Sequence, residues 1–124
     1  MQLSDMIHFY GTHDIEEPTH FYVDLLGLKL VLDQGKCRIF EILDHSYIAF
    51  CEHLEVTHSY KSPLITFIID DVDETYQQLK DKVNIIQPPM KNEQFQLYHF
   101  FCTDNNGYTL EFQRFLNPNW KEKQ

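Results

Sequence analysis

The same order of predicted elements occurs twice along the 124-residue chain, and this repeat limits the folds that the chain can adopt. Each half is predicted to form a strand, a helix and three further strands. Residues 13–17 (HDIEE) align with residues 70–74 (DDVDE), an offset of 57 residues, and residues 46–47 (SY) align with 107–108 (GY), an offset of 61. Internal repetition is typical of folds built from similar units. We therefore expect an α+β fold of two βαβββ modules in a pseudo-two-fold arrangement.

The two predicted helices have matching start signals. Asp14 is a suitable N-cap for the first helix, and Glu17 can complete a capping box three residues later. Gly27 is expected to end this helix in the left-handed conformation that suits glycine. Asp71 is expected to cap the second helix, again with a carboxylate, Glu74, three residues on.

Short aromatic or apolar runs bounded by turn residues predict the strands. In the first half they fall at residues 5–12, 29–33, 37–42 and 47–52. In the second half they fall at residues 64–70, 85–87, 96–103 and 108–115. The strand at 85–87 is expected to stop at Pro88 and Pro89.

These elements predict one domain over residues 1–116, followed by a polar C-terminal tail at 117–124. The domain consists of module one at about 5–52, a polar linker at about 53–62 and module two at about 63–116.

Charge and composition exclude several classes of function. The net charge is −9 and no basic stripe is present, so no nucleic-acid partner is expected. No apolar run reaches about 18 residues, so no membrane span is expected. The N-terminus has no secretion-signal pattern, which predicts a cytoplasmic protein.

Three cysteines, Cys37, Cys51 and Cys102, have no CxxC spacing. Cytosolic proteins keep most thiols reduced, so we expect three reduced cysteines. A reactive or metal-binding cysteine is the alternative.

Two motifs at the expected ends of the repeat resemble one known family. Residues 21–28 (FYVDLLGL) are similar to the FYxxxLGL signature that ends the first helix in glyoxalase, bleomycin-resistance and extradiol-dioxygenase proteins. Residues 104–111 (DNNGYTLE) resemble the D-P-D/N-G-x-x-x-E hairpin of these proteins, with Asn105 in place of the usual proline. The resemblance covers about residues 5–115 and points to the vicinal oxygen chelate (VOC) superfamily. It implies two modules whose curved sheets enclose a cavity. Dimers are common in this superfamily, so the resemblance also favours a dimer.

The second hairpin predicts which residues line this cavity. Residues 104–107 (DNNG) suit a short loop with a glycine bulge, which pairs Phe101 with Glu111 and His99 with Gln113. Side chains alternate along a strand, so the polar face that carries Thr109, Glu111 and Gln113 should line the cavity. The apolar face should pack on a helix.

The repeat extends this prediction to the first hairpin by pairing Leu43 with Tyr47. Phe40 then lies opposite Phe50, and Arg38 lies opposite Glu52, either as an ion pair of the cavity wall or with Arg38 as an anchor for a ligand carboxylate or phosphate. The complete set of predicted ligand-binding residues is Arg38, Phe40, Phe50, Glu52, His99, Phe101, Thr109 and Gln113.

The resemblance also implies four metal-ligand positions, on the first and last strands of each half. They fall on Ile7, Phe50, Leu64 and Glu111. Three of these are hydrocarbon side chains that cannot bind a metal, so the standard site is not expected. In a non-standard alternative, a bulge or a one-residue shorter loop before Asp14 would turn His8 inward, and the metal candidates would be His8, His99 and Glu111, with Glu52 as a further one.

Two functions remain open. The first is a binding protein that holds a small, partly apolar molecule in a cavity without a metal. The second is a lyase, isomerase or thiol transferase that uses Ni²⁺, Zn²⁺, Mn²⁺ or Fe²⁺, with Glu111 and His99 as catalytic residues. In both cases unpaired strand edges favour a homodimer.

Overall fold

The computed structural model describes residues 1–59 and 61–122. The chain forms two compact units, Met1–Thr57 and His58–Gln124, here called module one and module two. The boundary between the units falls within the predicted linker. No helix of the described residues is long and apolar enough to cross a membrane.

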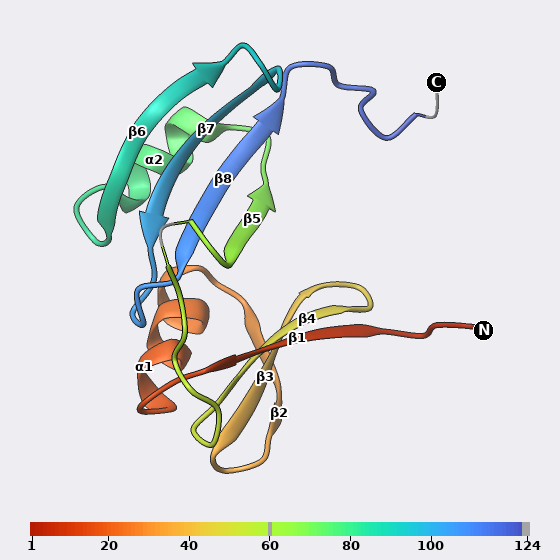
Figure 1. Ribbon diagram of the computed structural model, residues 1–124, viewed down its shortest axis with the longest axis vertical. Helices are drawn as coiled ribbons and strands as arrows, with labels where there is room; N and C mark the ends of the chain where they lie inside the picture. Colours follow the sequence, from red (N-terminus) through yellow and green to blue (C-terminus); the bar gives the residue numbers. More distant parts are fainter. Residues whose placement is uncertain (60, 123–124) are drawn as a thin grey trace. The chain divides into compact units, whose positions relative to one another are not determined.

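Module one contains a four-stranded sheet with one short helical segment (Figure 1). Its elements are β1 (Met6–Gly11), α1 (Glu16–Thr19), the π-helical turn η1 (His20–Leu25), β2 (Lys29–Asp33), β3 (Cys37–Leu43) and β4 (Ser46–Cys51). The strand order is β1-β4-β3-β2, with β1 parallel to β4 and the other pairs antiparallel.

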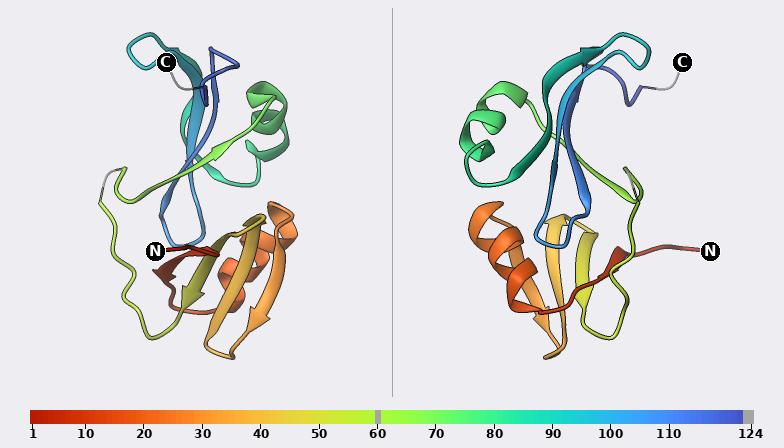
Figure 2. Two further views of the ribbon diagram at one scale, coloured as in Figure 1. Left: turned by 90° about the vertical axis from the view of Figure 1, so that its right-hand side faces the viewer. Right: turned by 60° about the vertical axis from the view of Figure 1, so that its left-hand side comes forward.

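Module two repeats this arrangement. Its elements are β5 (Leu64–Ile68), α2 (Val72–Leu79), β6 (Asn84–Asn92), β7 (Leu97–Thr103) and β8 (Thr109–Phe115). The strand order is β5-β8-β7-β6, and β5 is parallel to β8. In each module the helix covers one face of its own sheet (Figure 2).

Aromatic side chains between helix and sheet form the core of each module. In module one, the fully buried ring of Tyr22 on η1 lies 4.9 Å from the ring of Phe50 and 6.4 Å from that of Phe40. In module two, the ring of Tyr76 on α2 lies 5.4 Å from the ring of Phe100. Burial of an aromatic side chain of this size contributes about 1.5–3 kcal/mol, so these contacts hold each helix on its sheet.

The two helices begin differently. Asp71 caps α2 as predicted, because its side chain accepts a hydrogen bond from the Glu74 N–H at 2.9 Å. In the first helix, the Asp14 side chain accepts a hydrogen bond from the Glu16 N–H at 3.0 Å. The N-cap position is Ile15, which makes no capping hydrogen bond through its side chain. The capping box predicted with Glu17 is therefore wrong. Gly27 ends the helical segment with φ of 81°, as predicted.

The two hairpins also differ in their loops. In module two, Phe101 lies opposite Glu111 and His99 lies opposite Gln113, as predicted, with Gly107 at φ 89° in the loop. In module one, Leu43 pairs with Ser46 rather than Tyr47. A two-residue loop with His45 at φ 64° replaces the longer predicted loop, and the pairing is irregular just before the loop, between Glu41 and Leu43. The register predicted for the first hairpin is wrong for this reason.

Strand β6 is longer than predicted. It runs through Pro88 and Pro89 to Asn92 and pairs with β7, with shifts of register around the prolines. The strand is at the edge of its sheet, where proline is tolerated because no second neighbour needs its missing N–H.

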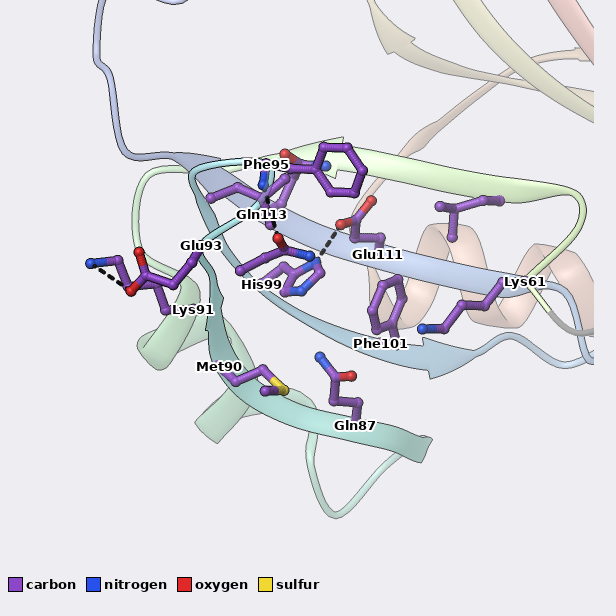
Figure 3. Close-up of a pocket in the computed structure, with 13 residues that line it drawn as sticks. Lys61, Gln87, Met90, Lys91, Glu93, Phe95, His99, Phe101, Glu111 and Gln113 are labelled. Atoms are coloured by element: carbon purple, nitrogen blue, oxygen red, sulfur yellow. Dashed lines mark hydrogen bonds and ion pairs between the residues drawn. The ribbon is translucent and has the colours of Figure 1, made fainter.

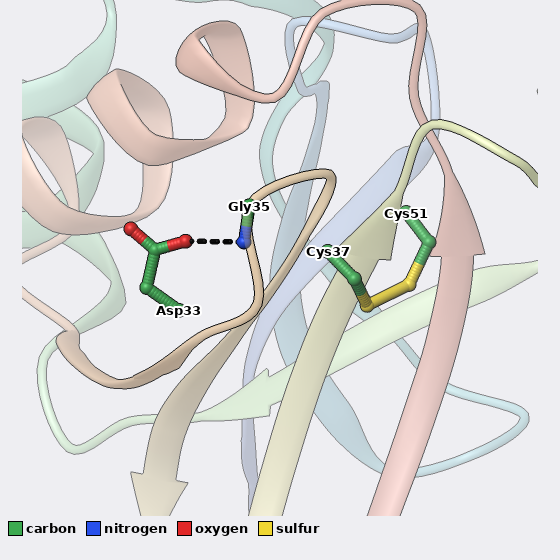
Figure 4. The surroundings of a disulfide bond; sticks show 4 residues. All are labelled: Asp33, Gly35, Cys37 and Cys51. Carbon is green, nitrogen blue, oxygen red and sulfur yellow. Dashed lines mark hydrogen bonds between the residues drawn. A yellow bond between two sulfur atoms is a disulfide. The ribbon is translucent and has the colours of Figure 1, made fainter.

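A disulfide joins Cys37 and Cys51 (Figure 4). The two residues lie directly opposite each other on β3 and β4, with their Cα atoms 4.1 Å apart. The expectation of three reduced thiols is therefore wrong, because a sequence separation of 14 residues conceals this cross-strand pairing. Cys102 is a free, buried cysteine, and burial raises the pKa of its thiol to about 12.

Candidate functional site

A cavity of about 520 Å³ lies on the face of the module two sheet that α2 does not cover (Figure 3). Its walls combine apolar, amide and charged side chains. They are Lys61, Leu64, Gln87, Met90, Lys91, Asn92, Glu93, Phe95, Leu97, His99, Phe101, Glu111 and Gln113. A concave, partly apolar surface of this size with a few polar groups is typical of small-molecule sites.

Strand alternation places the central polar residues of this cavity. Gln87, Phe101, Glu111 and Thr66 form one row across the four strands. His99 and Gln113 lie in the next row, on the same face. Phe100 and Phe112 alternate with these residues and face α2, so the sheet separates the core from the cavity.

His99 and Glu111 form a buried pair in the cavity wall. The Nδ1 atom of His99 lies 2.5 Å from Oε2 of Glu111, and the other carboxylate oxygen accepts a hydrogen bond from the Thr66 hydroxyl at 2.7 Å. The side chains of His99 and Glu111 are 8% and 6% exposed. Both carboxylate oxygens thus have partners, and the imidazole is held in one orientation with Nε2 left for other contacts.

Two amide side chains in the wall carry buried atoms without a partner among the described residues. They are Nε2 of Gln87, on β6, and Oε1 of Gln113, on β8. A buried polar atom without a partner is costly, by about 1–3 kcal/mol. Such atoms at a cavity wall are therefore suited to hydrogen bonds with a bound molecule.

Charged side chains of both signs surround the cavity. The Nζ atom of Lys61 lies 4.1 Å from the centre of the Phe101 ring. Lys91 and Glu93 form an ion pair with 3.4 Å between Nζ and Oε1, and both side chains are exposed. This pair is worth little energetically because water screens it.

The residues predicted for module one lie elsewhere. Phe40 and Phe50 contact Tyr22 and belong to the core between sheet and helix. Arg38 lies on the same face, where its guanidinium donates to Thr19 Oγ1 at 3.0 Å and to Glu16 at 2.9 Å. These four contacts correct the prediction that this face lines a cavity, because the shorter loop of the first hairpin changes which residues correspond in the two modules.

The predicted ion pair between Arg38 and Glu52 is also wrong. Arg38 pairs with Glu16 and Asp33, and the hydrogen bond from its guanidinium to Glu16 raises its pKa. Glu52 accepts a hydrogen bond from the Ile15 N–H at 3.0 Å and pairs with Lys36 at 3.1 Å. Both contacts favour the carboxylate, the backbone bond most, and lower the pKa of Glu52.

In module two, the cavity contains His99, Phe101, Glu111 and Gln113 of the predicted set. Thr109 is buried on the same face of β8 but is not among the residues that line the cavity. The prediction missed the residues that β6, the loop after it and residue 61 contribute. Side-chain exposure alternates along β6, but its residue types (NIIQPPMKN) do not, and its two prolines are unusual in a strand, so no local sequence signal indicated these residues.

A family model decides how these modules are classified. The model of the Glyoxalase/Bleomycin resistance protein/Dioxygenase superfamily matches residues 6–112, which is most of the chain. The chain belongs to this superfamily. The resemblance found in residues 21–28 and 104–111 is confirmed.

Relatives within the superfamily agree with this assignment. Metallothiol transferase FosB from Staphylococcus saprophyticus is 29% identical over 108 residues, which cover 82% of this chain and 70% of the relative. A glyoxalase/bleomycin resistance protein/dioxygenase from Alicyclobacillus acidocaldarius has a TM-score of 0.76 at 16% identity, with 95% and 96% of the two chains covered. Lactoylglutathione lyase from Agrobacterium tumefaciens has a TM-score of 0.70 at 18% identity, with 88% and 91% covered. The two structures show that the fold is shared.

The divalent metals that this superfamily uses do not fit the residues present here. Among the described residues, no group of three or more His, Cys, Asp or Glu side chains could hold a metal ion. Glu111 has both oxygens engaged, and Leu64 offers no donor atom. His8 pairs with Ile48 in an unbroken parallel register, so the bulge that would have turned it to the other face is absent from β1.

Proposed function

We propose that this member of the superfamily is a binding protein for a small, partly apolar molecule, held in the cavity of module two without a metal. The cavity is large enough for a ligand of one or two rings, since small-molecule sites begin at about 300 Å³. Leu64, Met90, Phe95 and Leu97 would contact its apolar part.

The observation that carries this proposal is the pair of unpartnered amide atoms in the cavity wall. Gln113 is 7% exposed, yet its Oε1 has no partner among the described residues, and the same holds for Nε2 of Gln87. A wall that served only packing would have apolar side chains at these positions, because an unpartnered buried amide is destabilising.

Ligand screening by thermal shift, followed by calorimetry, tests the proposal. Leu64 lines the cavity, so Leu64→Trp should fill it and weaken binding of any hit by at least about tenfold. Ile68 is a matched control, because it lies on the same strand, is exposed and does not line the cavity. A hit that binds Leu64→Trp and Ile68→Trp equally well occupies another place and contradicts the proposal.

The second candidate is a metal-dependent transferase, lyase or isomerase, which the similarity to a metallothiol transferase favours. It would need His8, His99 and Glu111 to bind one ion, against the donor geometry described above. Elemental analysis after incubation with Ni²⁺, Zn²⁺, Mn²⁺ or Fe²⁺ separates the two functions. Near-stoichiometric metal that is lost in Glu111→Ala would favour the enzyme and overturn the metal-free proposal.

We also propose that the protein forms a homodimer, as members of the superfamily often do. Sedimentation at micromolar concentration tests this, and a species of about 15 kDa would contradict it.

A further inference from the structure

The cavity of module two has hydrogen-bonding ends of opposite kind. We propose that it takes a neutral hydroxyaryl carbonyl compound, which donates its hydroxyl proton to the His99–Gln113 end and accepts a hydrogen bond at the Gln87 end through its carbonyl oxygen. This inference rests on the proposed function, because it assigns a chemical class to the ligand of the same cavity.

The first end presents two acceptors side by side. His99 and Gln113 lie directly opposite each other on β7 and β8. Oε1 of the buried Gln113 side chain has no partner among the described residues. Nδ1 of His99 is directed at Glu111, so in the neutral imidazole with its proton on Nδ1 the other nitrogen, Nε2, would be a second acceptor beside Gln113 Oε1. Only a ligand that supplies an O–H or N–H group satisfies this end.

The second end presents a donor. Nε2 of Gln87 is buried and unpartnered among the residues described, and Gln87 lies opposite Phe101 on the neighbouring strand. Two strand spacings separate β6 from β8, which is about 10 Å across the sheet. Gln87 and Gln113 lie two strands apart and in adjacent rows of the same face, so we infer that a ring with substituents at opposite positions spans the space between their amide groups.

The space between the two ends is apolar. Phe101 and Met90 line it, and the Phe101 ring lies 4.7 Å from the imidazole of His99 in an edge-on arrangement. A flat ring buries more apolar area here than a flexible chain of the same length and loses less conformational entropy on binding.

The fixed charges of the wall favour a neutral ligand. Lys61 and Lys91 carry positive charge, Glu93 and Glu111 carry negative charge, and the sum is zero with a neutral imidazole. A ligand carboxylate would lie near the buried carboxylate of Glu111, and like charges repel. A phenolic hydroxyl and a ketone supply the same hydrogen bonds without that repulsion.

Calorimetry with three matched probes tests the assignment. The probes are 4-hydroxyacetophenone, 4-methoxyacetophenone, which lacks the donor, and 4-ethylphenol, which lacks the acceptor. We expect each deletion to weaken binding by about tenfold or more, because it leaves one buried amide atom of the wall unpaired.

Two variants assign each preference to one side chain. In Gln113→Met, which keeps the length of the side chain, the preference for hydroxy over methoxy should fall to within about twofold, while the preference for acetyl over ethyl stays. In Gln87→Met the preference for acetyl over ethyl should fall to within about twofold, while the preference for hydroxy over methoxy stays. Thermal melts establish that both variants are folded.

The outcomes separate this inference from the proposed function. Equal binding of the three probes, or unchanged preferences in both variants, overturns the ligand class while the cavity still binds. The ligand class is also overturned if none of the three probes binds but the screen finds a ligand of another class whose binding Leu64→Trp blocks. If no hit in a screen is sensitive to Leu64→Trp, the proposed function and this inference both fail.

Discussion

The two modules share one topology but differ on the face of the sheet that the helix leaves uncovered. In module two this face carries the pairs His99–Gln113 and Phe101–Glu111. When the modules are matched by the faces that pack on their helices, the corresponding pairs of module one are Cys37–Cys51 and Ile39–Ala49. A disulfide and hydrocarbon thus stand where module two has an imidazole, an amide and a carboxylate.

This difference shows how a duplicated scaffold can keep its core and confine polar groups to one half. Aromatic residues face the helix in both modules, Phe40 and Phe50 in one and Phe100 and Phe112 in the other, and of these Phe50 and Phe112 occupy corresponding positions. The uncovered face is free of that packing constraint, so it can differ between modules without loss of the fold.

The largest effect is expected from placing a charged side chain of the module two face at the corresponding position of module one. Ala49 is fully buried and corresponds to Glu111, so Ala49→Glu places a carboxylate where Phe9 and Ile39 offer no hydrogen bond. We expect a loss of about 5 kcal/mol, which is comparable to the whole stability of a small domain. Urea unfolding measures it, with Ala49→Gln as a control of the same size without charge. A stable Ala49→Glu protein would show that the two faces do not correspond.

The next effect distinguishes the two faces of module one itself. Phe50 is fully buried against Tyr22, whereas Phe9 is 50% exposed on the other face. Phe50→Ala should lower the free energy of unfolding by about 3–5 kcal/mol, and Phe9→Ala by no more than about 1 kcal/mol. Similar losses in the two variants, measured by chemical denaturation, would contradict the assignment of Phe50 to the core.

Removal of the disulfide should have a somewhat smaller effect. Cys37 and Cys51 close a loop with a separation of 14 residues, for which cross-linking contributes about 3 kcal/mol. Cys37→Ser and the wild-type protein in reductant should therefore melt alike and below the oxidised wild type. Thiol titration of the folded, oxidised protein should also be slow, because the high pKa of the buried Cys102 leaves little thiolate at pH 8. Titration of two further thiols, those of Cys37 and Cys51, in the protein without reductant would disprove the cross-link.

The smallest effect concerns Glu52, whose pKa is lowered chiefly by the hydrogen bond from the Ile15 N–H. A carboxylate with a lowered pKa in the folded state stabilises the fold above its unfolded pKa, and this contribution is lost as the pH falls through the folded value. Glu52→Gln should therefore be slightly less stable than wild type at pH 6, and the two should converge towards pH 3. Thermal melts across this range measure it, with Glu122→Gln as a control. A constant difference at all pH values would exclude the ionised carboxylate as the cause.

Local sequence signals correctly predicted the features that depend on the conformational or capping preference of a single residue. Asp71 as a helix cap, Gly27 as a helix end and Gly107 in the second hairpin were all predicted on such grounds. The register of that hairpin followed from its loop, and it brought His99, Phe101, Glu111 and Gln113 onto one face.

The errors arose where a prediction was copied from one module to the other. The first hairpin has a loop of different length, so an offset taken from Tyr47 and Tyr108 gave the wrong partners. One residue of offset exchanges the two faces of a strand, which is why Arg38, Phe40, Phe50 and Glu52 were assigned to a cavity. The contributions of Gln87 and Met90 were missed because an edge strand that contains two prolines is unusual, and no local signal distinguishes it from a loop.

The two prolines of β6 have a consequence for how copies of this chain can associate. A sheet that is open on both sides can add neighbours without limit, which is the route to fibres. In the module two sheet the outer strands are β5 and β6, and because successive N–H groups of a strand point to opposite sides, one of Pro88 and Pro89 removes a donor from the open edge of β6. A neighbouring strand would meet an interrupted ladder there, so strand pairing between copies is less favourable at β6 than at β5.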